Sequence, residues 1–123
     1  MNITDAEWKI MEELWQQSPL SILDLTKRLE KDTGWKRHTI ISFLNRLEAK
    51  HAVELLPDAP VKSYKPIVTR DKAVKTETLN FLNKVHKGSL LDYVSYFSPE
   101  KNLSKEERQE LAKLIKKLED GEQ

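Results

Sequence analysis

No more than two apolar residues stand next to one another anywhere in this chain of 123 residues. A membrane-spanning helix needs about 20 apolar residues in succession, and a secretory signal needs an apolar stretch of about 7–15. The buried strands of a parallel sheet are also continuous apolar runs. We therefore expect no membrane insertion and no parallel sheet, which leaves folds built from amphipathic helices or half-buried strands.

The apolar residues instead recur at the three- and four-residue spacing of amphipathic helices. Helix starts are marked at 4–7, 21–24 and 104–107, where a serine or threonine precedes an acidic residue by three positions. Pro19, Gly34 and Gly88 are expected to end helices. The predicted helices span about residues 5–18, 21–33, 36–50, 71–87, 90–97 and 104–118.

The periodicity changes after residue 50. Two short extended runs, 53–56 and 61–68, lie on either side of Pro57-Asp58-Ala59-Pro60 and predict a hairpin. The prolines favour a sheet edge, because proline cannot donate to a strand ladder. Three helices followed by a hairpin is the order of a winged helix-turn-helix. We predict a mainly α fold with a small β-hairpin, comprising a winged-helix DNA-binding domain (1–70) and a helical dimerisation domain (71–123).

The composition excludes several kinds of functional site. The chain has no cysteine, only three glycines and three scattered histidines. Without cysteine there is no disulfide, thiolate metal site or thiol nucleophile, and the chain would work unchanged in a reducing cytoplasm. Glycine-rich phosphate loops are also missing. His38, His51 and His86 show neither metal-binding spacing nor a nucleophile motif, so we expect no metal, no cofactor and no enzymatic activity.

The charge is concentrated on the third predicted helix. The net charge is only +1, yet residues 34–51 carry four Lys or Arg against one Glu, a local charge of +3. Ile40, Phe43, Leu44 and Leu47 share one helix face, and small polar residues lie opposite. Short polar side chains let a helix lie deep in the major groove of duplex DNA. The expected DNA contacts are Lys36, Arg37, His38, Thr39, Ser42, Asn45 and Arg46, with Lys62 of the hairpin on the flanking backbone.

The C-terminal third has more apolar side chains than three short helices can bury by themselves. They are Leu79, Leu82, Val85, Leu90, Leu91, Val94, Phe97, Leu111, Leu114, Ile115 and Leu118. Burying each contributes about 1.5–3 kcal/mol, and leaving them exposed promotes aggregation. A homodimer would cover them and would match a palindromic DNA site. The alternative is that they pack on the winged helix of the same chain.

A set of motifs spread over nearly the whole chain adds a family resemblance. The motifs are Ala6-Glu7-Trp8 with Leu14-Trp15, Trp35 and Thr39-Ile40 with Arg46-Leu47, Tyr64 with Pro66, and Phe81-Leu82 with Lys87-Gly88. Together they resemble the BlaI/MecI penicillinase-repressor family, which also includes copper-responsive repressors. The resemblance implies a homodimeric repressor that binds a palindromic operator, a double-stranded DNA site, through positions that include Thr39 and Arg46.

The resemblance also implies a way to relieve repression. The β-lactam-responsive members are cut before a phenylalanine in the dimerisation module, after a membrane sensor detects the antibiotic. The matching bond here is Tyr96–Phe97, with Tyr96 where those members have an asparagine. Cleavage at this bond, and a membrane sensor protease as a partner, therefore stay open. The cysteine cluster of the copper-responsive branch is absent, which excludes copper sensing through thiolates.

Two further departures concern the region around the third helix. His51 follows Lys50 where the family has glycine, so His51 would need the left-handed conformation that glycine adopts easily. The tip of the hairpin carries prolines and Asp58 in place of glycine and arginine, which leaves contact between wing and DNA open.

Other functions stay open at this stage. One is a winged-helix regulator that responds to a different inducer, and another is a winged-helix adaptor that binds protein. Any single polar residue of the third helix could also be ordinary solvated surface. The sequence does not name the operator, the regulated genes or the inducer.

Overall fold

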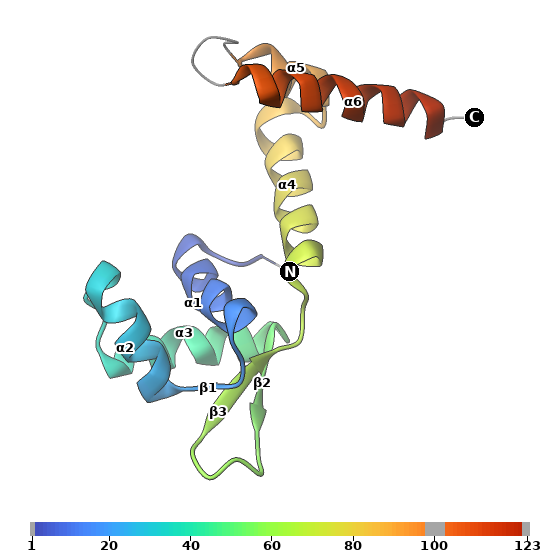
Figure 1. Ribbon diagram of the computed structural model, residues 1–123. Helices are drawn as coiled ribbons and strands as arrows, with labels where there is room; N and C mark the ends of the chain where they lie inside the picture. The colour runs from blue at the N-terminus through green and yellow to red at the C-terminus, as the bar shows by residue number, and fades with distance from the viewer. Residues whose placement is uncertain (1, 98–102, 122–123) are drawn as a thin grey trace. The chain divides into compact units, whose positions relative to one another are not determined.

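The computed structural model describes residues 2–97 and 103–121 (Figure 1). They belong to two compact units, formed by residues 1–79 and 80–123 of the chain. Within the described ranges, no helix combines the length and apolarity needed to cross a membrane.

The first unit has the element order predicted for a winged helix. It consists of α1 (Asp5–Gln16), β1 (Leu20–Ser21), α2 (Ile22–Thr33), α3 (Arg37–Ala49), β2 (Val53–Leu56), β3 (Ser63–Pro66) and the beginning of α4 (Arg70–His86). In Figure 1 the three helices α1, α2 and α3 lie together and the β2–β3 hairpin extends from them. The predicted mainly α fold is confirmed.

The sheet differs from the prediction by one strand. It is antiparallel with the order β1-β3-β2, and Tyr64 of β3 pairs with Leu20 on one side and Leu55 on the other. The two residues of β1 are too few to show an alternating pattern, and Ser21 also caps α2, so the sequence signal there is that of a helix start. The predicted second run, 61–68, is also too long, because β3 ends at Pro66.

The predicted helix starts are confirmed by their hydrogen bonds. The side chain of Thr4 accepts from the backbone N–H of Glu7, and the Glu7 carboxylate accepts from the N–H of Thr4. Ser21 and Asp24 form the same reciprocal pair at α2. Gly34 ends α2 with a φ of 68°, a left-handed conformation that glycine adopts without a Cβ clash.

The core of the first unit is built where the three helices meet the sheet. Its largest fully buried side chains are Glu7, Ile10, Met11, Leu14, Leu25, Ile40, Leu44, Leu47 and Val53. Aromatic side chains border this core, and the indole N–H of Trp15 donates to the carbonyl of Val68 at 2.9 Å. This bond connects α1 to the segment that precedes α4.

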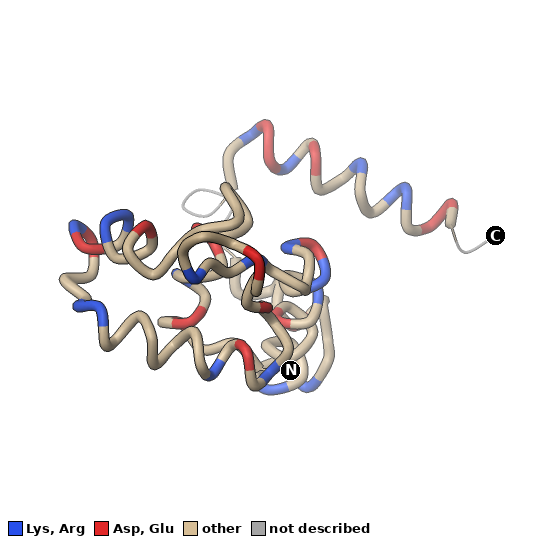
Figure 2. The backbone as a smooth tube through the Cα atoms, turned by 90° about the horizontal axis from the view of Figure 1, so that it is seen from below, with Lys and Arg blue, Asp and Glu red and all other residues tan. Residues whose placement is uncertain are grey.

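The second unit contains the rest of α4, α5 (Leu90–Ser95) and α6 (Lys105–Gly121). Among its described residues only Leu82 and His86 are buried, and α5 and α6 contain no buried residue. Residues of both charges are spread along α6 among uncharged ones (Figure 2). The unit thus has little core of its own within the described residues.

Candidate nucleic-acid interface

The start of α3 differs from the starts of α1 and α2. Lys36 occupies the N-cap position and its side chain makes no capping hydrogen bond. The first N–H groups of a helix carry partial positive charge and bind anions when no side chain satisfies them. Lys36 and Arg37 are both exposed there. The N-terminus of α3 therefore presents two cations and uncapped backbone N–H donors together.

The outer face of α3 carries the remaining predicted DNA contacts. His38, Ser42, Asn45 and Arg46 are exposed, and Thr39 is half-buried at the edge of this face. The opposite face, with Ile40, Leu44 and Leu47, is fully buried, in agreement with the predicted spacing. Within the described residues, none of the predicted contacts on α3 uses its side chain for a hydrogen bond or ion pair. Their polar groups are free to bind a ligand.

Lys50 is the cation of this segment that is already used inside the protein. Its ammonium lies 2.5 Å from Oε1 of Glu7, which has no exposed surface. Burial raises the pKa of Glu7, but hydrogen bonds from Lys50 and Thr4 and the charge of Lys50 lower it more, so the pKa lies below its ordinary value of 4.5. The ion pair joins the start of α1 to the end of α3.

The residue after this lysine adopts the conformation that the sequence indicated. His51 has a φ of 61°, the left-handed region. This conformation is strained for a residue other than glycine. A hydrogen bond from the N–H of His51 to the carbonyl of Glu48, 3.0 Å long, helps to hold it. The end of α3 is therefore fixed both by the Glu7–Lys50 pair and by this turn.

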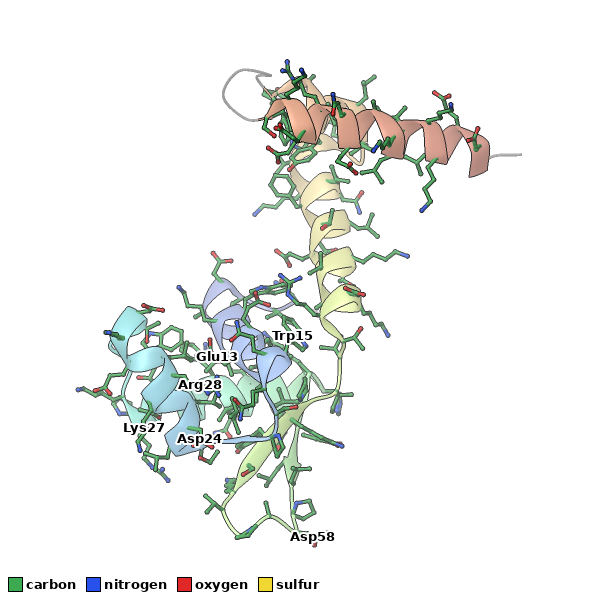
Figure 3. All side chains as sticks on the ribbon, in the orientation of Figure 1. Glu13, Trp15, Asp24, Lys27, Arg28 and Asp58 are labelled. Atoms are coloured by element: carbon green, nitrogen blue, oxygen red, sulfur yellow. The ribbon has the colours of Figure 1, made fainter. Side chains whose placement is uncertain are left out.

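The hairpin offers few free cations. Lys62 is exposed, but it lies in the loop before β3 rather than on the predicted strand. Lys65 is paired with Glu54 across the hairpin at 3.0 Å. Asp58 lies at the tip of the hairpin, as Figure 3 shows. A negative charge at this position disfavours close approach to phosphate.

An aromatic contact that the sequence did not predict lies beside Arg46. The guanidinium carbon of Arg46 is 5.8 Å from the centroid of the Phe43 ring, and the Phe43 and Trp35 rings are 4.9 Å apart. The signal was present as the three-residue spacing of Phe43 and Arg46 on one helix. The same spacing also places Phe43 with Ile40, Leu44 and Leu47 on the apolar face, so the contact with Arg46 is evident only in the structure.

The predicted dimer contacts are mostly exposed in the single chain. Leu79, Val85, Leu90, Leu91, Leu114, Ile115 and Leu118 are exposed, Val94, Phe97 and Leu111 are half-buried, and Leu82 is buried. At the candidate cleavage bond, Tyr96 is 75% exposed, while the Phe97 ring packs against Tyr93 with centroids 5.0 Å apart.

Aromatic rings surround the one buried histidine of the second unit. Nδ1 of His86 lies 2.6 Å from a carboxylate oxygen of Asp92, and the rings of Phe81, Tyr93 and Tyr96 have centroids within 5.7 Å of the imidazole. The sequence does not reveal this cluster, because His86 and Asp92 lie six residues apart on either side of the break at Gly88. It stabilises the junction of α4 and α5 within the second unit.

Sequence comparison identifies relatives along almost the whole chain. The family model described as penicillinase repressor matches residues 3–117. The penicillinase repressor of Bacillus licheniformis is 30% identical over 113 residues, which are 92% of this chain and 88% of that protein. The methicillin resistance regulatory protein MecI of Staphylococcus aureus strain N315 is 27% identical over 115 residues, 94% of each chain.

Solved structures agree with this relationship. The DNA-binding domain of the repressor BlaI is 30% identical with a TM-score of 0.52, covering 58% of this chain and 87% of that one. The oxidised form of MarR from Escherichia coli is 23% identical with a TM-score of 0.51, covering 95% and 76%, and shows the fold alone. The chain belongs to the penicillinase repressor family, whose members are transcriptional repressors and not enzymes.

Proposed function

We propose that this protein is a homodimeric repressor that binds a palindromic operator, with α3 of each subunit in the major groove. The observation that carries the proposal is the outer face of α3. It combines exposed polar side chains, which make no internal hydrogen bonds in the described part of the chain, with Arg46 and two cations at the helix start. Such a face can bond base edges along its length and phosphates at its end.

A solved complex of a relative supports this arrangement. The monomeric form of BlaI from Bacillus licheniformis has been solved with the blaP half-operator, and it is 29% identical to this chain with a TM-score of 0.52. The match covers 58% of this chain and 88% of that one. A half-operator implies a complete site with two halves, each for one subunit. We therefore assign one half-site to each α3.

Dimerisation is supported by the exposed apolar side chains of the second unit. Leu91 is 80% exposed and Leu114 is 56% exposed, whereas leucines in a protein core are almost fully buried. A second copy of the chain would bury them in a contact with two-fold symmetry. The proposed contact comprises Leu79, Leu82, Val85, Leu90, Leu91, Val94, Phe97, Leu111, Leu114, Ile115 and Leu118.

The dimer would give the protein its affinity for the operator. One α3 offers few phosphate contacts, whereas two tethered recognition helices raise the effective concentration and increase avidity by ~10²–10⁴. Bound across a promoter, the dimer would occlude RNA polymerase. Whatever separates the subunits would then release the DNA, and the protein would act in the cytoplasm, where the operator is.

We include relief by proteolysis in the proposal because of Tyr96. This residue directly follows α5 and is exposed, so a protease can reach the Tyr96–Phe97 bond once Phe97 leaves Tyr93. Treating cells with a β-lactam should yield a fragment that begins at Phe97, detected by N-terminal sequencing. Derepression without cutting at this bond would instead indicate another inducer.

The proposal is tested by selecting bound sequences from random duplexes with the full chain. We expect one palindromic consensus and an affinity that falls steeply with salt, as phosphate contacts require. Failure to enrich any sequence, with weak binding that does not respond to salt, would contradict DNA recognition. That result would favour the protein-binding adaptor.

A further inference from the structure

We propose that Phe43 and Trp35 are positioning residues that hold Arg46 in the orientation in which it reads a base pair. The inference rests on the proposed function of α3 and adds a specificity role for two side chains that lie beside the polar face. It is carried by one continuous series of contacts in the first unit, which leads from the turn before α3 to the Arg46 guanidinium.

The series begins at the turn between α2 and α3. Gly34 has a left-handed backbone, and its N–H donates to the carbonyl of Glu30 at 2.8 Å. The N–H of Trp35 donates to Oγ1 of Thr33 at 3.1 Å, and this hydroxyl donates to the carbonyl of Leu29 at 2.7 Å. The backbone of Trp35 is thereby fixed to the last turn of α2.

The indole of Trp35 continues the series onto α3. Its ring centroid lies 4.9 Å from that of Phe43, with 54° between the planes. Aromatic pairs at this separation attract one another beyond the burial of their area. Both rings are half-buried against the core of the unit, so neither rotates freely. Phe43 is therefore held by its contacts with Trp35 and with the core.

Arg46 lies three residues after Phe43, about one turn further along α3, where the polar face borders the apolar one. Its guanidinium carbon is 5.8 Å from the centroid of the Phe43 ring, within the range of a cation–π contact. Among the described residues no carboxylate pairs with Arg46, so this ring is its single partner. A long arginine side chain otherwise samples many rotamers in water.

The contact should therefore affect specificity more than fold stability. A guanidinium must present its planar fork to bond the two acceptors of a guanine. The Phe43 ring supports this plane before DNA arrives, so less rotamer freedom is lost on binding. Without the ring, Arg46 would still attract phosphate and would discriminate poorly between base pairs.

The test uses the full chain and two duplexes, the selected operator and a variant with one base pair changed. The changed base pair is one that alters binding by wild type but not by Arg46→Ala. The measured quantity is the ratio of affinities for the two duplexes, about 5- to 150-fold for a good arginine–guanine contact. We expect Phe43→Leu to reduce this ratio about 2- to 5-fold. Phe43→Tyr, which retains the ring face, should preserve it.

Two comparisons separate positioning from a structural role. In the Arg46→Ala background, Phe43→Leu should change the ratio no further. Phe43→Met fills the site without a ring and should behave like Phe43→Leu; it replaces Phe43→Leu if that variant lowers the melting temperature. A ratio equal to that of wild type in both variants, or an equal loss of affinity for both duplexes, would overturn the inference while leaving operator binding intact. If Arg46→Ala affects no base pair, the inference and the assigned role of Arg46 both fail.

Discussion

The two units differ in how completely they bury their own apolar side chains. In the first unit, Ile10, Leu25 and Leu44 have no exposed surface, and even a carboxylate is buried with an ion partner. In the second unit, α5 and α6 have no buried residue among those described. The first unit thus has a closed core as one chain, whereas the described part of the second leaves apolar side chains exposed, which is the basis for the proposed dimer.

The units also use aromatic side chains differently. In the first, Trp8, Trp15, Trp35 and Phe43 border an aliphatic core. In the second, aromatic rings surround His86, and Leu114 and Leu118 of α6 stay exposed. A unit that closes on itself through a small aromatic cluster can present its aliphatic residues to a second copy. This division is what we would expect if, as proposed, the first unit reads DNA and the second forms the dimer.

The largest effect is expected from a charge in the apolar face of α6. Leu114→Asp would place an unpaired carboxylate in the proposed subunit contact, which is strongly unfavourable. We expect monomers in sedimentation and a loss of operator affinity of ~10²–10⁴. Gln109→Asp adds the same charge on the exposed polar face of α6 and should leave the dimer intact. A Leu114→Asp protein that sediments as a dimer would contradict the contrast between the units.

A leucine-to-alanine truncation in each unit sharpens the contrast. Leu44→Ala should lower the free energy of unfolding by about 2–5 kcal/mol at any protein concentration, because it leaves a cavity in a closed core. Leu118→Ala should matter only where dimers form, so its effect on the melting temperature should vanish on dilution. Thermal melts over a concentration series measure both. Equal, concentration-independent effects would show that the second unit has its own core.

The buried ion pair of the first unit predicts a pH dependence. Glu7 has a lowered pKa in the folded state, so its contribution is full above 4.5 and is lost as the pH falls through the folded value. Glu7→Gln should destabilise the protein by about 1.5–3 kcal/mol at neutral pH. Urea unfolding from pH 7 to pH 3 should show this gap closing below about 4.5. A constant gap would exclude an ionised Glu7 as its cause.

The smallest effect is expected from Arg46→Ala, which should change operator binding but not fold stability. Arg46→Ala should weaken operator binding by about 1–3 kcal/mol and relax the preference at one base pair. Since Arg46 is exposed, the melting temperature should stay unchanged. Glu48→Ala, on an exposed position of the same helix, is a matched control and should not reduce binding. Titrations in matched salt measure both, and unchanged affinity in Arg46→Ala would remove this residue from the interface.

The sequence predicted the parts of the fold that depend on local signals. Each of these signals involves residues only a few positions apart, so it can be recognised in the sequence. Examples are the helical spacing of apolar residues, the Thr4–Glu7 and Ser21–Asp24 capping pairs, and the left-handed Gly34. The two-residue β1 has no periodicity and owes its existence to β3, which lies about forty residues later. Such a strand depends on tertiary pairing, which a single sequence does not show.

The candidate site was predictable to the same extent. The polar face of α3 follows from helical spacing alone, and the exposed positions agree with it. The Glu7–Lys50 pair joins residues 43 positions apart, so the sequence does not show it. The local charge of +3 for residues 34–51 therefore includes a lysine that is already paired inside the protein. Trp35 and Phe43 are residue types that usually belong to a core. Their contacts with one another and with Arg46 are seen only in the structure.

Sedimentation of the protein with the selected operator and with its half-site tests the central claim most directly. The account predicts a dimer in the absence of DNA, two subunits on each complete operator, and binding to the isolated half-site that is weaker by ~10²–10⁴. One subunit on the complete operator, bound as tightly as the half-site is, would contradict it.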